Sequence, residues 1–202
     1  MADLRRLLSV GLLLTAATAA AHNMAGVARI KPGSPFHFLN MRAVLPHATG
    51  PTLGEIEFDP LRGSALAFLV IDPAQPANLA EAHRFERLVK TLPHTHGFLV
   101  ALPHRSQLPQ YLVGIMAQEH FTLPLLIDQR DIFPYSFGFG LTESPRYEFF
   151  DLSGTLIVEN PAALAQRLPT GLTIEGILRE LDAGHVVEPV ALSTRDDIPP
   201  RR

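Results

Sequence analysis

Two uninterrupted apolar segments with a helical pattern between them constrain the fold of this 202-residue chain more than any other feature. Residues Ala65 to Ile71 read ALAFLVI and residues Gly97 to Leu102 read GFLVAL, without the alternation of a half-exposed strand. Such runs are typical of strands buried on both faces of a parallel sheet. Asn78 and Glu81 have the spacing of a capping box, which predicts where the intervening helix begins. Its apolar face comprises Leu79, Ala82, Phe85, Leu88, Val89 and Leu92, and Pro93 ends it.

The strand and helix pattern then repeats. Residues Ser106 to Phe121 have a second helical pattern, and Leu123 to Ile127 form a third short apolar strand. Two strand-helix-strand units in succession imply parallel pairing with right-handed crossovers, so the fold class is α/β. Upstream, Phe36 to Val44 and Gly54 to Phe58 are expected to form an N-terminal β-hairpin extension.

The C-terminal part of the chain has a different pattern. Two strand-like segments, Tyr147 to Asp151 and Thr155 to Glu159, flank Leu152-Ser153-Gly154, which predicts a hairpin. A last helix is expected over Thr173 to Leu181, with Gly184 ending it. The sheet is therefore expected to contain both parallel and antiparallel pairs.

The first 21 residues have the order of an export signal. Arg5 and Arg6 precede the apolar run Leu7 to Leu14 and the small-residue stretch Thr15 to Ala21. A helix that crosses a bilayer needs about 20 apolar residues, so we expect cleavage, with retention as a membrane anchor as the alternative. The expected organisation is a signal peptide over 1–21, an irregular lead-in over 22–35, a domain over 36–184 and a flexible tail over 185–202. The protein is thus expected to be periplasmic or secreted, with no membrane span after cleavage.

Charge gives no indication of a nucleic-acid partner. The whole chain has 17 Lys and Arg against 20 Asp and Glu. Cleavage after Ala21 would remove Asp3, Arg5 and Arg6 and leave a small net negative charge. A nucleic-acid-binding domain instead needs a basic surface.

The order of elements, together with two sequence stretches, resembles the thioredoxin-like redoxin family of the TlpA/ResA and AhpC/TSA type. The stretches are GEIEFDPLRGSALAFLVIDP (54–73) and ESPRYEFFDLSGTLIVE (143–159), and the resemblance covers about residues 31 to 184. It implies a thioredoxin-like fold, in which a central mixed sheet is flanked by helices. It also implies a cis-proline at Pro145 after Ser144, and an active-site loop between the strand Ala65 to Ile71 and the next helix.

The chain departs from this family in having no cysteine. Where active members carry Cys-x-x-Cys, this sequence reads Asp72-Pro73-Ala74-Gln75-Pro76-Ala77-Asn78, with Pro73 and Pro76 at the cysteine positions, give or take one residue. Thiol-disulfide exchange and thiol peroxidase chemistry both require a thiolate, so the composition excludes them. The prolines are interpreted as fixing the start of the helix, with a ligand-binding loop as the alternative. The residues of this pseudo-active-site loop are Asp72, Pro73, Gln75 and Pro76.

The resemblance also implies a groove, which in active relatives receives an extended polypeptide beside the cis-proline. Our leading hypothesis is an exported, redox-inactive module that binds an envelope polypeptide or assists its assembly. The alternative from the same resemblance is a residual enzymatic activity that does not use a thiol. The expected groove and cis-proline loop residues are Ser144, Pro145, Arg146, Tyr147, His104 and Arg105.

Nine histidines and four methionines keep a third function open. Imidazole and thioether ligands suit copper, and cleavage after Ala19 or Ala21 would bring His22 close to a new N-terminal amine. A periplasmic copper protein using His22 and Met24 is therefore the alternative to histidines that are merely solvated. No other cofactor is expected.

Overall fold

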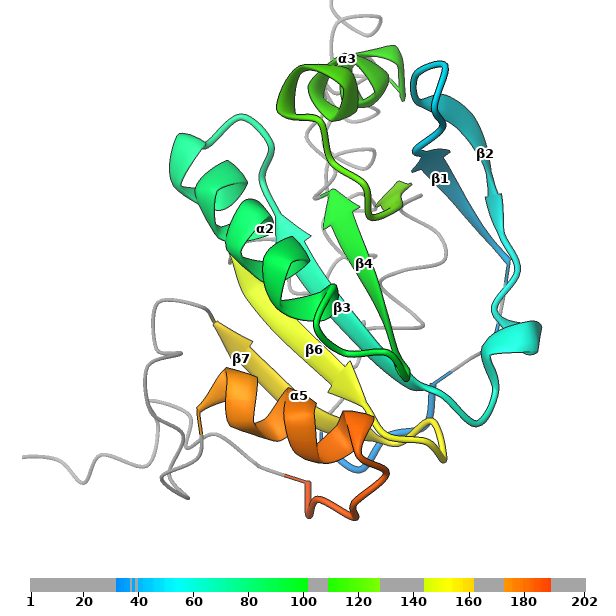
Figure 1. Ribbon diagram of the computed structural model, residues 1–202, viewed down its shortest axis with the longest axis vertical. Coiled ribbons are helices and arrows are strands. Elements are labelled where there is room, and N and C mark those ends of the chain that lie inside the picture. Colours follow the sequence, from blue (N-terminus) through cyan, green and yellow to red (C-terminus); the bar gives the residue numbers. More distant parts are fainter. Residues whose placement is uncertain are drawn as a thin grey trace, which may run out of the picture.

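The computed structural model describes residues 32–36, 38, 40–101, 109–127, 144–161 and 173–189. These residues form a seven-stranded sheet with helices packed against it (Figure 1). The expected signal peptide, His22, Met24, His104, Arg105 and the end of the tail lie outside the described residues. In chain order the elements are β1 (Met41–Leu45), β2 (Thr52–Ile56), the 3-10 helix η1 (Asp59–Leu61), β3 (Ala65–Ile71), α2 (Pro76–Val89), β4 (Thr95–Ala101), α3 (Pro109–Glu119), β5 (Leu125–Ile127), β6 (Arg146–Phe150), β7 (Leu156–Pro161) and α5 (Ile174–Asp182).

The sheet is mixed, as predicted, with the strand order β2-β1-β5-β4-β3-β6-β7. The apolar strands β3 and β4 pair in parallel, and β4 pairs in parallel with β5. The β1–β2 hairpin and the β6–β7 hairpin add antiparallel pairs on the two sides of this parallel centre. Every residue of β3 is buried, because the strand lies inside the sheet with side chains packed on both faces.

Helices α2, α3 and α5 contribute to a single apolar cluster with one face of the sheet (Figure 1). Helix α2 buries Ala82, Phe85 and Val89 in this layer, three of the positions that the helical pattern predicts. Gly97 on β4 allows the close approach of α2, since a Cβ atom there would lie 2.7 Å from Cγ1 of Val89. In the described part of the chain, no helix combines the length and apolar character that a bilayer-crossing segment needs.

A buried carboxylate on α2 also fixes the loop that precedes β5. Glu86 is 5% exposed, and its Oε1 accepts hydrogen bonds from the backbone nitrogen of Leu123 (3.0 Å) and from the backbone nitrogen and Oγ1 of Thr122 (2.5 Å each). Nζ of Lys90 lies 3.8 Å from the same oxygen. The carboxylate therefore satisfies two backbone donors that would otherwise lose their partner on folding.

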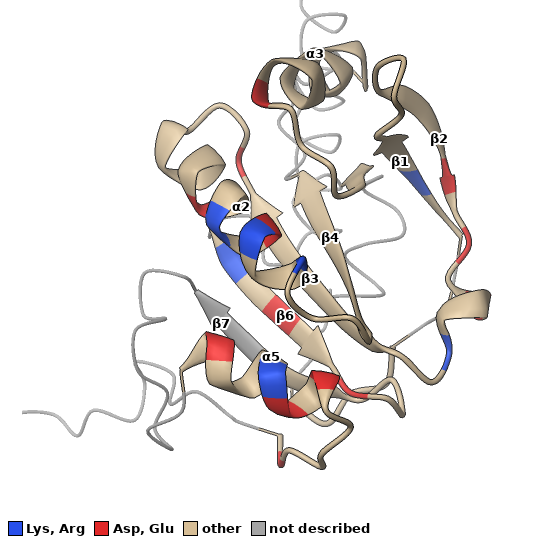
Figure 2. Ribbon diagram, in the orientation of Figure 1, with Lys and Arg blue, Asp and Glu red and all other residues tan. Residues whose placement is uncertain are grey.

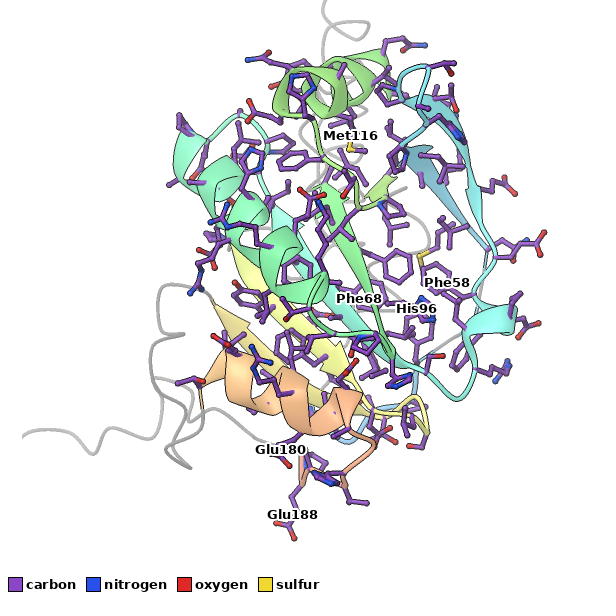
Figure 3. The ribbon with its side chains drawn as sticks, viewed as in Figure 1. Phe58, Phe68, His96, Met116, Glu180 and Glu188 are labelled. Carbon is purple, nitrogen blue, oxygen red and sulfur yellow. The ribbon has the colours of Figure 1, made fainter. Side chains whose placement is uncertain are left out.

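Phenylalanine rings fill the other face of the sheet (Figure 3). Phe68 of β3 stacks on Phe98 of β4 with 5.3 Å between ring centroids, and Phe58 lies 5.0 Å from Phe98. Phe36 contacts Phe150 of β6 at 5.0 Å. Such ring pairs contribute about 0.5 to 1.5 kcal/mol beyond the area they bury, so this cluster joins β3, β4 and β6 to two segments outside the central sheet.

The expectation of one strand over Phe36 to Val44 is wrong. The strand is limited to Met41–Leu45, and the preceding segment pairs elsewhere. The backbone nitrogen of Phe36 donates to the carbonyl of Gly154 (2.6 Å), and Pro35 forms a bridge with Thr155. Gly154, with φ of +77°, forms the hairpin turn against which this segment packs, and a Cβ there would lie 3.1 Å from the Phe38 ring.

Candidate functional site

The carboxyl end of β3, the start of α2 and the start of β6 meet at one end of the sheet (Figure 1). The ladder between β3 and β6 ends with the pair Val70 and Arg146. One step further along this antiparallel register brings Pro145 beside Ile71, and Asp72 follows at once. The Ser144-Pro145 peptide bond is cis, as expected, and both residues are half-buried. The fold therefore brings the two predicted loops together.

Polar side chains in the pseudo-active-site loop bind one another. The Asp72 carboxylate accepts a hydrogen bond from the Ala74 backbone nitrogen (3.0 Å) and one from Nε2 of Gln75 (2.8 Å). Oδ1 of Asn78 accepts from the backbone nitrogen of Asp72 (3.0 Å), and Nδ2 of Asn78 donates to Gln75 (3.2 Å). This closed set of bonds ties the end of β3 to the first turn of α2.

Helix α2 begins at Pro76, three residues before the start that an Asn78 N-cap predicts. Gln75 is the N-cap in an extended conformation and makes no side-chain cap hydrogen bond. Pro76 suits the first turn because its φ is fixed in the helical range and a missing N–H costs nothing there. The predicted capping box is wrong, since Asn78 bonds Asp72 and Glu81 bonds elsewhere. This geometry agrees with the interpretation that Pro76 fixes the start of the helix.

Several solved structures share the fold of this chain. One is a proposed protein disulfide isomerase from Bacteroides thetaiotaomicron, which is 12% identical over 77% of this chain and 90% of its own, with a TM-score of 0.54. Another is a thiol:disulfide interchange protein of the thioredoxin family from Chlorobium tepidum, 15% identical over 78% and 97% of the two chains, with a TM-score of 0.52. A third is the exposed lipoprotein thioredoxin from Streptococcus pneumoniae, 15% identical over 72% and 99%, with a TM-score of 0.51.

The chain has a thioredoxin-like fold. No protein-family model and no curated protein sequence matches the chain, so the likeness lies in the structure.

This thioredoxin-like domain has no sulfur nucleophile where the helix begins. The chain contains no cysteine, and the loop from Asp72 to Asn78 contains no hydroxyl group either. Residues 74–77 at the tip of the loop are exposed, whereas the Asp72 carboxylate is buried and already hydrogen-bonded. A mixed disulfide cannot form here. The loop can still offer backbone groups, an amide side chain and apolar surface to a ligand.

Strand β6 sends two of the predicted groove residues to opposite faces of the sheet. Arg146 is only 1% exposed, and its Nη2 pairs with Oε1 of Glu148 at 2.6 Å in the layer that contains the phenylalanines. The expectation that the Arg146 side chain lines a binding groove is therefore wrong. Tyr147 belongs instead to the layer of helices α2 and α5.

The hydroxyl group of Tyr147 joins two residues of α2 that the sequence analysis did not connect with it. It donates a hydrogen bond to the Glu81 carboxylate and accepts one from Nη2 of Arg84 (3.2 Å). Nη2 of Arg84 also binds Glu81 directly at 2.6 Å. Burial, together with the bond to Glu81, raises the pKa of Tyr147 well above its ordinary value of 10. Only the spacing of Glu81 and Arg84, three residues apart, is visible in the sequence.

A Tyr147→Phe variant tests this network through its pH dependence. At pH 7 we expect it to lose about 1 kcal/mol of unfolding free energy, because one buried hydrogen bond is removed. Because the pKa of Tyr147 is higher in the folded than in the unfolded state, its contribution to stability is fully present below about pH 10. This contribution is lost as the pH rises further. Urea unfolding from pH 7 to 12 should therefore show wild type and variant converging above pH 10. Tyr111→Phe, at an exposed position, should follow wild type, and a constant gap for Tyr147→Phe would contradict the assignment.

The histidines of the described residues do not form a metal site. His94 and His96 are exposed at the amino end of β4 (Figure 3), and β3 runs parallel to β4, so they lie opposite the Asp72 loop. Within the described ranges, no three His, Asp or Glu side chains are grouped closely enough to hold a metal ion. Since His22 and Met24 lie outside those ranges, copper binding stays a prediction.

Proposed function

We propose that this protein is an exported, cysteine-free relative of the TlpA/ResA and AhpC/TSA redoxins, which binds an extended polypeptide without exchanging disulfides. The observation that carries the proposal is the retained junction between the Asp72 loop and Pro145 in a chain that has no cysteine. Ser144 and Pro145 are partly exposed and lie past the last paired residue of the β3–β6 ladder. An extended segment can pair with backbone groups at such a position.

Two of the solved structures support this proposal. The interchange protein from Chlorobium tepidum, by its description, acts on thiols and disulfides, and a surface that receives a polypeptide can persist when the nucleophile is lost. The thioredoxin from Streptococcus pneumoniae is an exposed lipoprotein. Together with the signal-like order of residues 1–21, it supports a location outside the cytoplasm.

The absence of thiol-disulfide activity is tested by the reduction of insulin with dithiothreitol. We expect precipitation of the insulin B chain at the uncatalysed rate, because no thiolate is present to form the mixed disulfide. A cysteine-containing thioredoxin serves as the positive control. A rate above the uncatalysed one would overturn the assignment as a redox-inactive protein.

The binding of a polypeptide is tested with reduced, carboxymethylated α-lactalbumin, an unfolded polypeptide that can be labelled for fluorescence anisotropy. We expect binding by the wild-type protein and at least tenfold weaker binding by Ser144→Trp, because the indole would cover the surface beside Pro145. Thr52→Trp is the matched control, at an exposed position of edge strand β2, and should bind like wild type. Absence of binding by wild type, or equal binding by all three proteins, would refute the proposed surface.

A further inference from the structure

An open groove lies between α2 and α5, over Tyr147 of β6. Figure 1 shows these two helices on the same face of the sheet. Its volume is about 730 Å³, within the range of about 300 to 1,000 Å³ that is common for ligand sites. Along α2 it extends from Glu81 to Leu88, about 10 Å at 1.5 Å per residue, and Thr91 lines it in the turn that follows the helix. An extended peptide of about three residues spans the α2 side of the groove.

The charged residues of the groove form ion pairs within each helix. Arg84 pairs with Glu81 on α2, and Arg179 pairs with Glu175 on α5 at 2.8 Å. Among the described residues no ion pair crosses from one helix to the other, so no such contact closes the groove.

A third arginine makes the groove positive. Arg87 of α2 is exposed and lines the groove, but none of the ion pairs between described residues uses its guanidinium group. Three arginines and two glutamates therefore line a groove on a chain whose net charge is −3. Figure 2 shows basic and acidic positions on both α2 and α5. A carboxylate is the planar anion that an arginine fork binds through two hydrogen bonds.

Apolar side chains lie between these charges. Phe85 and Ile174 form buried parts of the lining, and Leu88 is half-buried between the two helices. The groove thus offers apolar contacts at its centre and a guanidinium group at its rim, a combination that suits alternating apolar and acidic side chains.

The Tyr147 end of the groove is close in the chain to the surface beside Pro145. Pro145 directly precedes β6 and lies two positions from Tyr147, a distance of about 7 Å in an extended chain. This short distance, together with the length of the groove, favours a polypeptide as the occupant over a small anion.

We propose that the α2–α5 groove binds an acidic polypeptide segment, with a carboxylate on Arg87 and apolar side chains over Leu88 and Ile174. The inference rests on the proposed function and specifies the chemistry of the partner. It requires that removing the Arg87 charge weakens the binding of an acidic ligand and leaves the binding of a neutral ligand of the same shape unchanged.

The test uses two capped pentapeptides, Glu-Leu-Glu-Leu-Glu and Gln-Leu-Gln-Leu-Gln, titrated into the ¹⁵N-labelled protein and followed by NMR. We expect amide shifts to concentrate in residues 84–91 and 173–179, and the acidic peptide to bind at least fivefold more tightly than the neutral one. Arg87→Gln should abolish this difference. Arg62→Gln removes one exposed positive charge directly after η1, which Figure 1 shows on the opposite side of the molecule from α2 and α5, and should keep the difference within a factor of two of wild type.

Three results would overturn the inference. They are equal affinity for the two peptides, shifts that map outside the two helices, and stronger perturbation of the same residues by inorganic phosphate, which would indicate a small-anion site. If Ser144→Trp loses α-lactalbumin binding and any of these three results is also found, the proposed function stands. Only the proposal for the α2–α5 groove is then refuted. Absence of α-lactalbumin binding by wild type would instead refute the proposed function.

Discussion

An Arg146→Met variant is expected to lose about 3 to 5 kcal/mol of its unfolding free energy, the usual cost of removing one partner from a buried ion pair. Arg146 and Glu148 are 1% and 0% exposed and are joined at 2.6 Å. Without the guanidinium group, the Glu148 carboxylate would keep its charge in an apolar layer and lose its nearest compensating group. Urea unfolding monitored by circular dichroism at pH 7 measures the loss.

The double variant Arg146→Met/Glu148→Leu is the matched control for this experiment. Because apolar residues of similar volume often replace a buried ion pair at no net cost, we expect most of the lost stability to return. If the single variant were as stable as wild type, the pair would not compensate buried charge. If the double variant were less stable than the single one, both charges would serve other contacts in that layer.

A Glu86→Ala variant is expected to show the second large loss, about 2 to 4 kcal/mol. The substitution leaves the backbone nitrogens of Thr122 and Leu123 without their acceptor, and a hydrogen bond to a charged group contributes about 1.5 to 3 kcal/mol. Glu86→Gln keeps an acceptor oxygen in the same place and should lose less than half as much. Both values follow from urea unfolding.

Glu180→Ala is the surface control for Glu86. Its side chain is 49% exposed and pairs with the exposed His185, so the loss should stay within about 0.5 kcal/mol. Equal losses for Glu86→Ala and Glu180→Ala would show that Glu86 does not hold the loop before β5.

The sequence predicts the fold where one local signal decides the structure. The apolar runs of β3 and β4 have the length and composition typical of strands inside a sheet, and the Asp151 to Gly154 turn joins β6 to β7 as the hairpin signal indicates. The start of α2 was misplaced because Asn78 has two possible partners. Asn78 can cap a helix or form a hydrogen bond with the preceding loop. In the structure its Oδ1 accepts a hydrogen bond from the buried backbone nitrogen of Asp72, so it does not cap α2.

The candidate site was predicted only in part, because its main contacts join residues far apart in the sequence. Tyr147 lies 66 positions from Glu81 and 63 from Arg84, and nothing local in the chain pairs them. The sequence predicts a surface position for Arg146 because charged residues are seldom buried. Glu148, two residues along the same strand, faces the same side of the sheet and compensates the charge of Arg146 when both are buried.

The pairing of Pro35 with Thr155 has a consequence for how the chain folds. The two residues are 120 positions apart, and contacts of such long sequence separation slow folding because the chain must close a large loop first. Phe36 joins the Phe68 and Phe150 rings only when this bridge is in place. During synthesis from the N-terminus, the ring cluster therefore stays incomplete until the ribosome has released the chain beyond Leu156.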